Sequence, residues 1–216
     1  MLDPSATWDR EPEKYAAGAA YQRITKLEDP WFVIDFLEAL DRVDAGPRIL
    51  SLGCNTGDEL VLVKRRYPAA QITGLDRDAS ALAVARDRFP DATFIEADLA
   101  QPLPVGRFDL VVCIGTLQSG NLDDRELLRR IVQDHAGAVL FGVPNCRYLD
   151  GEQRSGARMK NFTQPELGLL VKDIAFYRKY LQQHDREVWV TGKSYLLVTA
   201  RSRADRAAPP PDRAPP

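Results

Sequence analysis

Short, continuously apolar segments alternate with longer segments of helical periodicity along this chain of 216 residues. The longer segments repeat their apolar residues every three to four positions, as amphipathic helices do. The predicted strands span residues 48–52, 70–76, 92–98, 108–115 and 137–145. The predicted helices span residues 29–43, 58–68, 80–90, 123–135 and 164–185.

This alternation predicts βαβ units, and therefore a parallel sheet with helices on both faces. The segment 108–115 is apolar throughout, as expected for a strand that is covered on both sides. Two further strands, 186–192 and 194–200, are joined by a Gly-Lys turn and form a predicted terminal hairpin. We therefore predict an α/β fold.

The length favours one large domain, residues 46–202, with a segment on either side. Residues 1–45 form a predicted N-terminal helical segment and a candidate lid. Residues 203–216 are rich in Pro and Ala without large apolar side chains, which predicts a disordered tail. No apolar run approaches the roughly 20 residues of a membrane helix, and the polar N-terminus does not resemble a signal peptide. These features favour a cytoplasmic protein without a membrane partner.

The net charge bears on nucleic-acid binding, and the cysteine spacing bears on metal binding. Lys and Arg total 29 against 31 acids, a formal charge of -2, so no global field draws the chain to nucleic acid. A local basic patch would still suffice for RNA. Cys54, Cys113 and Cys146 lie far apart without the spacing of metal ligands, which predicts free thiols and no metal site.

The stretch "ILSLGCNTGDELVLV" places Gly53 and Gly57 between a predicted strand and a predicted helix. In an open α/β sheet, ligands lie beyond the carboxyl ends of the strands. Glycines allow the backbone to approach a ligand, and a helix N-terminus presents free amides. A tight turn without a ligand is an equally valid interpretation of these two residues alone.

Two acids end the next two predicted strands. Asp76 follows the glycines by about twenty residues, where an acid can accept both hydroxyls of a ribose. Asp98 would lie near an adenine ring, although either acid alone could be a helix cap or a solvated loop residue. Three such strand ends in succession favour a nucleoside ligand. A nicotinamide dinucleotide fits less well, because Asn55 interrupts the pattern G-x-G-x-x-G.

The segments "LSLGCNTG", "ITGLD", "FIEAD" and "FDLVVCIGTL" resemble the class I S-adenosylmethionine-dependent methyltransferases, roughly over residues 49–200. The resemblance implies S-adenosyl-L-methionine as cofactor and a Rossmann-like sheet of seven strands in the order 3-2-1-4-5-7-6, the last antiparallel. It also implies a set of cofactor-binding residues: Gly53, Cys54, Asn55, Gly57, Asp76, Arg77, Asp98, Leu99 and Cys113.

Two positions depart from that family's pattern. Ser51 stands where the family usually has an acid, whose role is to orient the loop and meet the methionine ammonium. Asp58 is a candidate substitute for it. Asn55 replaces the central glycine, and Asn tolerates positive φ better than most other residues.

The polar segment from Cys146 to Thr163 has no apolar period and is predicted to be a long loop on the methyl-donor side. Its Arg side chains suit an anionic substrate, or else they are simply solvated. Asn145 and Tyr148 are the candidate catalytic residues, whereas His135 and His184 are predicted at surface positions near helix ends. The candidate substrate-binding residues are Tyr15, Tyr21, Arg147, Arg154, Arg158 and Lys160.

We therefore expect a methyltransferase that acts on a small molecule with an anionic or polar handle. The "NPPY"-type motif of adenine and glutamine methylation is absent after the fourth strand, where "CIGTLQSG" stands. Two alternatives remain: an RNA-modifying methyltransferase, and a non-catalytic protein that binds the cofactor.

Overall fold

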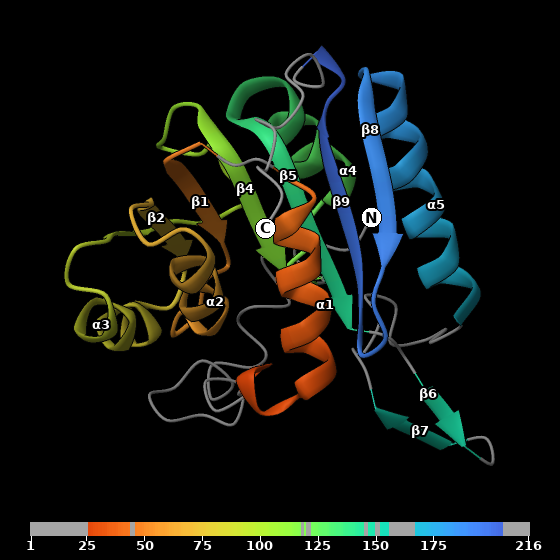
Figure 1. The fold of residues 1–216 in the computed structure, drawn as a ribbon, viewed down its shortest axis with the longest axis horizontal. Coiled ribbons are helices and arrows are strands. Elements are labelled where there is room, and N and C mark those ends of the chain that lie inside the picture. The colour runs from red at the N-terminus through yellow and green to blue at the C-terminus, as the bar shows by residue number, and fades with distance from the viewer. Residues whose placement is uncertain are drawn as a thin grey trace, which may run out of the picture.

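A computed structural model of the protein describes residues 26–43, 46–117, 119, 122–144, 147–149, 152–155 and 167–204. Its centre is a seven-stranded sheet in the order β3-β2-β1-β4-β5-β9-β8 (Figure 1). With the separate hairpin β6–β7 left out of the count, this is the predicted order 3-2-1-4-5-7-6. The predicted fold class is therefore confirmed.

The strands of the sheet follow the predicted apolar segments closely. β1 pairs in parallel with β2 and β4, whereas β9 runs antiparallel to both β5 and β8. Their bounds are β1 Arg48–Leu52, β2 Gln71–Asp76, β3 Thr93–Glu96, β4 Phe108–Ile114, β5 Ala136–Pro144, β8 Arg186–Thr191 and β9 Tyr195–Ser202.

Aspartate side chains cap the N-termini of three helices. Asp29 accepts hydrogen bonds from the backbone amides of Trp31 and Phe32 and so caps α1. Asp78 and Asp123 do the same for the helices that follow them. The helices are α1 Pro30–Asp41, α2 Asp58–Arg66, α3 Ala79–Arg88, α4 Asp124–Arg130 and α5 Leu167–Gln183.

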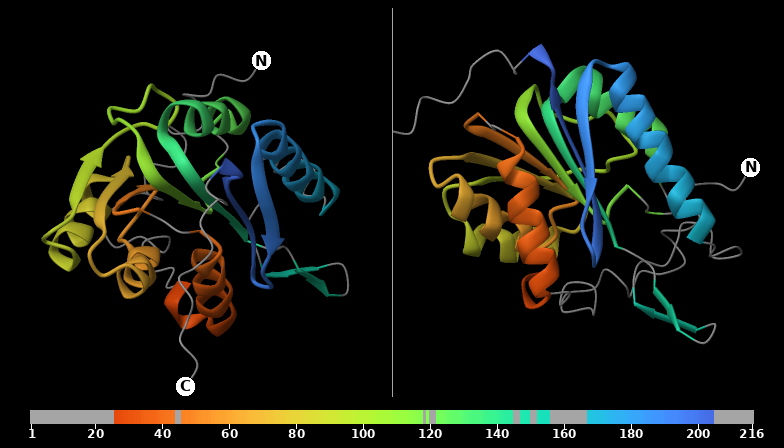
Figure 2. Two further views of the ribbon diagram at one scale, coloured as in Figure 1. Left: turned by 45° about the horizontal axis from the view of Figure 1, so that its top comes forward. Right: turned by 45° about the vertical axis from the view of Figure 1, so that its right-hand side comes forward.

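The helices cover both faces of the sheet, as Figure 2 shows. Leu110 and Val112 of β4 pack in the core cluster that holds α1, α2 and α3. Val111 and Cys113, which alternate with them, pack in the cluster that holds α4 and α5. Side chains that point to opposite faces along one strand thus hold both layers to the sheet.

The segment predicted as a long loop contains a short antiparallel hairpin. β6 Arg147–Leu149 pairs with β7 Glu152–Ser155, so the loop prediction is wrong for these residues. Few of their side chains are apolar, and apolar alternation is the pattern that reveals a half-buried strand. The overlooked signal is the sequence pair Asp150-Gly151, which is favoured in two-residue hairpin turns.

The predicted helix 123–135 changes its hydrogen bonding after Arg130. Residues Ile131–His135 form a π-helical turn that leads directly into β5. His135 is only 8% exposed, and its Nδ1 lies 3.0 Å from the Gly106 carbonyl oxygen. The prediction of a surface position is therefore wrong for His135, while His184 is exposed as predicted.

No helix among the described residues is long and apolar enough to cross a membrane.

The core under α1 offers a test of the fold. Phe36 is 0% exposed, so Phe36→Ala should lower the free energy of unfolding by about 3 to 5 kcal/mol through lost burial and a residual cavity. Guanidinium titration followed by circular dichroism measures this change. Ile34→Ala on the same helix is the control, because Ile34 is 49% exposed and should change stability by less than about 1 kcal/mol. Equal losses in the two variants would contradict this packing of α1.

Candidate functional site

The turn between β1 and α2, residues 53–57, has the backbone geometry that its glycines suggest. Gly53, Asn55 and Gly57 have φ angles of 67°, 49° and 84°. These values lie in the left-handed region, which Gly adopts without strain and Asn tolerates. We call residues 53–57 the glycine turn.

Hydrogen bonds attach the glycine turn to the end of β2. The amides of Gly53 and Cys54 donate to the Leu75 carbonyl oxygen at 2.7 and 3.1 Å. The amide of Asn55 donates to the Asp76 carboxylate at 2.8 Å. The predicted ribose-binding acid and the predicted cofactor loop therefore lie in direct contact.

Gly53 is also required by close packing against the residues that follow β4. A Cβ atom added at Gly53 would lie 2.1 Å from Oγ1 of Thr116, whose hydroxyl donates to the Leu52 carbonyl oxygen at 3.3 Å. A side chain at this position would therefore displace Thr116. The turn can keep its path between β1 and the end of β4 only with a glycine there.

Asp76 lies half-buried at the end of β2 and is held by backbone groups. Besides the Asn55 amide, its carboxylate accepts the Asp78 amide at 3.0 Å. Burial raises the pKa of Asp76, although hydrogen bonds from the amides of Asp78, Asn55 and Arg77 oppose the shift. A carboxylate has about four acceptor sites, so these amides do not saturate it. The side chain therefore has the chemistry to accept a ribose hydroxyl.

The second predicted acid, Asp98, follows β3 and is also half-buried. Its Oδ1 accepts the amide of Ala100 at 3.0 Å, so this oxygen organises the local turn. Arg130 of α4 donates to the Leu99 carbonyl oxygen at 2.8 Å and holds this turn against the domain. Asp98 therefore lies in a turn, where no helix follows it, at the same edge of the sheet as Asp76.

Several other predicted cofactor residues are core residues. The side chains of Cys54, Leu99 and Cys113 are buried. Any contact that they make with a ligand would therefore involve the backbone. Arg77, which follows Asp76, has an exposed side chain.

A buried ionic network below the glycine turn was not predicted from the sequence. The Glu59 side chain is 0% exposed; its Oε1 accepts from Ser51 Oγ at 3.1 Å and its Oε2 pairs with Lys26 Nζ at 2.7 Å. Burial alone would lower the pKa of Lys26, but the Glu59 carboxylate more than offsets this and the pKa is raised. We call Lys26, Glu59 and Ser51 the buried triad.

The neighbouring acid, Asp58, has different partners. Its carboxylate pairs with Arg88 at 2.9 Å and accepts the backbone amide of Lys26 at 3.3 Å. The acid that contacts Ser51 is therefore Glu59, and the role of Asp58 as a substitute stays a prediction. Helical periodicity does not distinguish the two acids, because Leu62 and Val63, four residues after Asp58 and Glu59, are both buried.

The predicted substrate and catalytic residues are described only in part. Arg147 and Tyr148 lie on β6 and Arg154 lies on β7, where Tyr148 pairs in register with Gln153. Residues Tyr15, Tyr21, Asn145, Arg158 and Lys160 lie outside the described residues. Within the described parts of the chain, no group of three or more His, Cys, Asp or Glu residues is placed to hold a metal ion.

Comparison with known proteins agrees with this geometry. Residues 49–134 match a family described as "Methyltransferase domain". This range begins in β1 and includes the glycine turn, Asp76 and Asp98. It ends near the start of β5, so it contains the candidate cofactor residues but not the hairpin β6–β7.

Curated relatives match a similar length of the chain. The trans-aconitate 2-methyltransferase of Afipia carboxidovorans is 42% identical over 77 residues, which are 36% of this chain and 30% of that protein. The enzyme of the same name from Escherichia coli O1:K1 / APEC is 41% identical over 70 residues, which are 32% of this chain and 28% of that protein. The matched part thus spans less than a third of these relatives.

Solved structures share the fold over most of the chain. The plantazolicin methyltransferase BpumL, in complex with a monoazolic desmethylPZN analog and SAH, is 15% identical with a TM-score of 0.63, and the match covers 92% of this chain and 94% of that one. Human N-acetylserotonin methyltransferase in complex with SAM is 20% identical with a TM-score of 0.58, covering 92% and 58%. Together with the sheet order, these structures show that the chain has the fold of the class I S-adenosylmethionine-dependent methyltransferases, and residues 49–134 are similar to a methyltransferase domain.

Proposed function

We propose that this protein binds S-adenosyl-L-methionine across the glycine turn and transfers its methyl group to a small molecule with an anionic or polar handle. The observation that carries the proposal is the contact between the Asn55 amide and the Asp76 carboxylate. It joins a backbone turn suited to close approach with an acid suited to a ribose, at the carboxyl edge of a parallel sheet.

Three parts of the site would hold the three parts of this cofactor. Asp76 would accept the ribose hydroxyls, and the turn at Asp98 and Leu99 would border the adenine. The glycine turn would line the methionine end, mainly through its backbone. When bound, the cofactor supplies a methyl group on a sulfonium that is already activated. The protein's main task is therefore to align the acceptor with that methyl group and to exclude water.

Direct transfer fits the state of the two described cysteines. Burial raises the pKa of Cys54 well above its ordinary value, and burial raises the pKa of Cys113 to about 12. Both thiols therefore stay protonated near neutral pH, whereas a nucleophilic cysteine needs its thiolate. The proposed mechanism uses neither of them as a nucleophile.

The substrate class rests on two indications. The curated relatives are trans-aconitate 2-methyltransferases, named for a small carboxylic acid. The segment that contains Arg147, Arg154, Arg158 and Lys160 offers side chains that pair with carboxylates. Tyr148 and Asn145, at the root of this segment, are the proposed contacts of the acceptor group.

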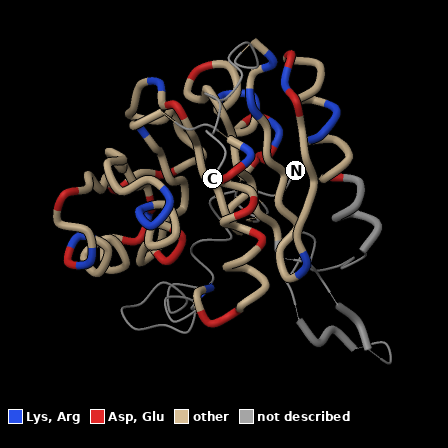
Figure 3. The backbone as a smooth tube through the Cα atoms, viewed as in Figure 1, with Lys and Arg blue, Asp and Glu red and all other residues tan. Residues whose placement is uncertain are grey.

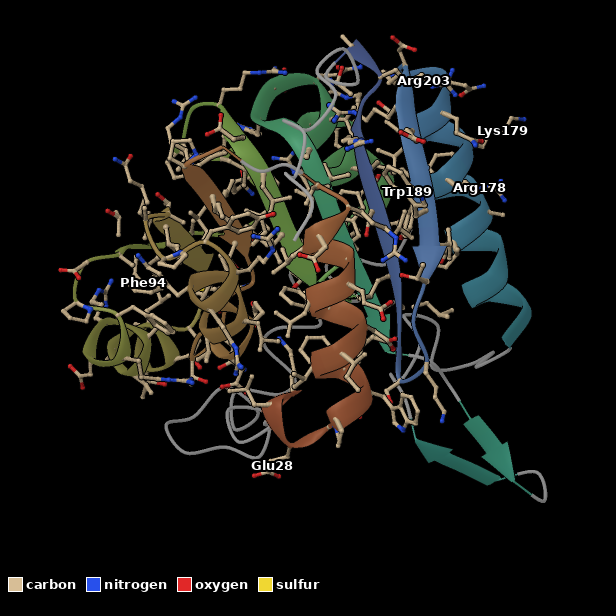
Figure 4. The ribbon with its side chains drawn as sticks, viewed as in Figure 1. Glu28, Phe94, Arg178, Lys179, Trp189 and Arg203 are labelled. Carbon is tan, nitrogen blue, oxygen red and sulfur yellow. The ribbon has the colours of Figure 1, made fainter. Side chains whose placement is uncertain are left out.

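The proposed partner is a small molecule rather than RNA. Figure 3 shows Lys and Arg interspersed with Asp and Glu along the described backbone. Figure 4 labels Arg203, which follows the end of the antiparallel strand β9, and Lys179, which lies on α5. Charges of both signs along the described backbone do not favour a continuous positive path for a phosphate backbone.

Cofactor binding is tested by removing the ribose acid. Asp76→Ala should weaken S-adenosylhomocysteine binding by about 1 to 3 kcal/mol, because buried hydroxyl partners are left unpaired. Isothermal titration calorimetry measures the affinity. Asp87→Ala, an exposed acid on α3, is the control and should bind normally. Unchanged affinity in Asp76→Ala would show that this carboxylate does not hold the ligand.

Thiol reactivity provides an independent test of the protonated cysteines. At pH 8 the native protein should react slowly with iodoacetamide at Cys54 and Cys113, because raised pKa values leave little thiolate and burial restricts access. In guanidinium chloride both should be alkylated quickly. Peptide mass spectrometry follows each site, and rapid native labelling of Cys113 would contradict the protonated state.

The segment after β5 is tested by separating turnover from cofactor affinity. Arg154→Ala, Arg158→Ala and Tyr148→Phe should each slow methyl transfer to the acceptor while S-adenosylhomocysteine binding persists. Transfer of a radiolabelled methyl group is measured with trans-aconitate as the first acceptor, then with metabolite extract and RNA. Full turnover in all three variants would mean that the segment is merely solvated. Loss of cofactor binding would mean that the segment contacts the cofactor and not the substrate.

A further inference from the structure

The buried triad connects three parts of the chain that are distant in sequence. Lys26 belongs to a 3₁₀ turn before α1, Ser51 lies in β1, and Glu59 lies in the first turn of α2. The Lys26 side chain is only 12% exposed and that of Glu59 is fully buried. The carboxylate is thus shared between one ammonium and one hydroxyl in the protein interior.

Stability alone does not account for such a network. Removing an ammonium and a carboxylate from water costs several kcal/mol per ion, and replacing a buried ion pair with apolar residues is often neutral or stabilising. The hydrophobic core cluster on this side of the sheet contains Leu60 and Val63 of α2 and Phe32 of α1. We therefore look for the role of the ion pair in its position beside the glycine turn.

Two members of the triad flank the glycine turn in the sequence. Ser51 stands two residues before Gly53, and Glu59 stands two residues after Gly57. The backbone amide of Lys26 also donates to Asp58, next to Glu59. The two ends of the turn are therefore joined to each other through one carboxylate, and both are joined to residue 26.

We propose that Lys26 and Glu59 are positioning residues, which act through Ser51 and the first turn of α2 to hold the glycine turn in the conformation that binds the amino-acid end of the cofactor. Neither side chain needs to touch the ligand, since Glu59 is fully buried. The opposite side of the turn is held by β2 and Asp76, which the proposed function assigns to the ribose.

This inference rests on the proposed function and adds a distinction between ligands. S-adenosylhomocysteine carries a zwitterionic amino-acid end, whereas 5′-methylthioadenosine has the same nucleoside without it. A network that positions the turn for the amino-acid end should affect the first ligand and leave the second almost unchanged. A network that only stabilises the fold has no reason to distinguish them.

The experiment uses the full chain, three variants of the triad and one control variant. Lys26→Met leaves the Glu59 charge buried without its ammonium, and Glu59→Gln leaves Lys26 without its carboxylate. The double variant Lys26→Met/Glu59→Gln has no buried charge, and its glutamine oxygen can still accept from Ser51. Asp41→Asn is the matched control, since it removes the carboxylate of an exposed pair with Arg66 between α1 and α2. Calorimetry with both ligands is combined with thermal unfolding.

Each single variant should unfold at a lower temperature, because breaking a buried pair leaves one charge uncompensated. The double variant should regain most of that loss, yet bind S-adenosylhomocysteine about tenfold more weakly than the wild type. Its affinity for 5′-methylthioadenosine should stay within about twofold. Asp41→Asn should match the wild type in all three measurements. Should a single variant fail to fold, the double variant still decides the question.

Two outcomes would overturn the inference. Wild-type affinity for S-adenosylhomocysteine in the double variant would show that the triad serves stability alone. An equal loss of both ligands would show general damage to the site. Failure of the proposed function is a separate result, since the wild-type protein would then bind neither ligand.

Discussion

The backbone hydrogen bonds between the glycine turn and the end of β2 are the constraint on which the candidate site depends. The Leu75 carbonyl oxygen receives the amides of Gly53 and Cys54, and the next residue, Asp76, receives that of Asn55. The parallel register of Leu52 with Leu75 makes this possible. Because parallel strands end at one edge of the sheet, an acid and a turn 21 positions apart become neighbours.

The sequence predicted the sheet and its helices because burial on both faces leaves a clear pattern. β4 is apolar at every position from Leu110 to Ile114, and α1 repeats its apolar residues with helical spacing. The order of the strands came from the resemblance, since periodicity does not specify pairing. The hairpin β6–β7 was missed because its short strands lack an apolar alternation. His135 was misplaced because its burial depends on a contact with distant Gly106.

Local sequence signals were sufficient to predict the parts of the site in which the backbone sets the geometry. Gly53, Asn55 and Gly57 revealed a turn with positive φ, and the end of β2 located Asp76. The buried triad could not be found in this way, because Lys26 and Glu59 are 33 positions apart and meet only through the packing of their side chains. A charged residue on the buried face of α2 was a hint that a partner exists, but it did not identify Lys26.

Two of the carboxylates near the glycine turn, Asp76 and Glu59, have opposite environments. Asp76 is half-buried and held by backbone amides, which leave acceptor capacity on a side chain near the surface. Glu59 is fully buried and bound by an ammonium and a hydroxyl of the protein. A ligand hydroxyl can therefore compete for Asp76 but cannot reach Glu59. We therefore propose that ligand recognition and positioning of the turn belong to different acids, Asp76 of β2 and Glu59 of α2.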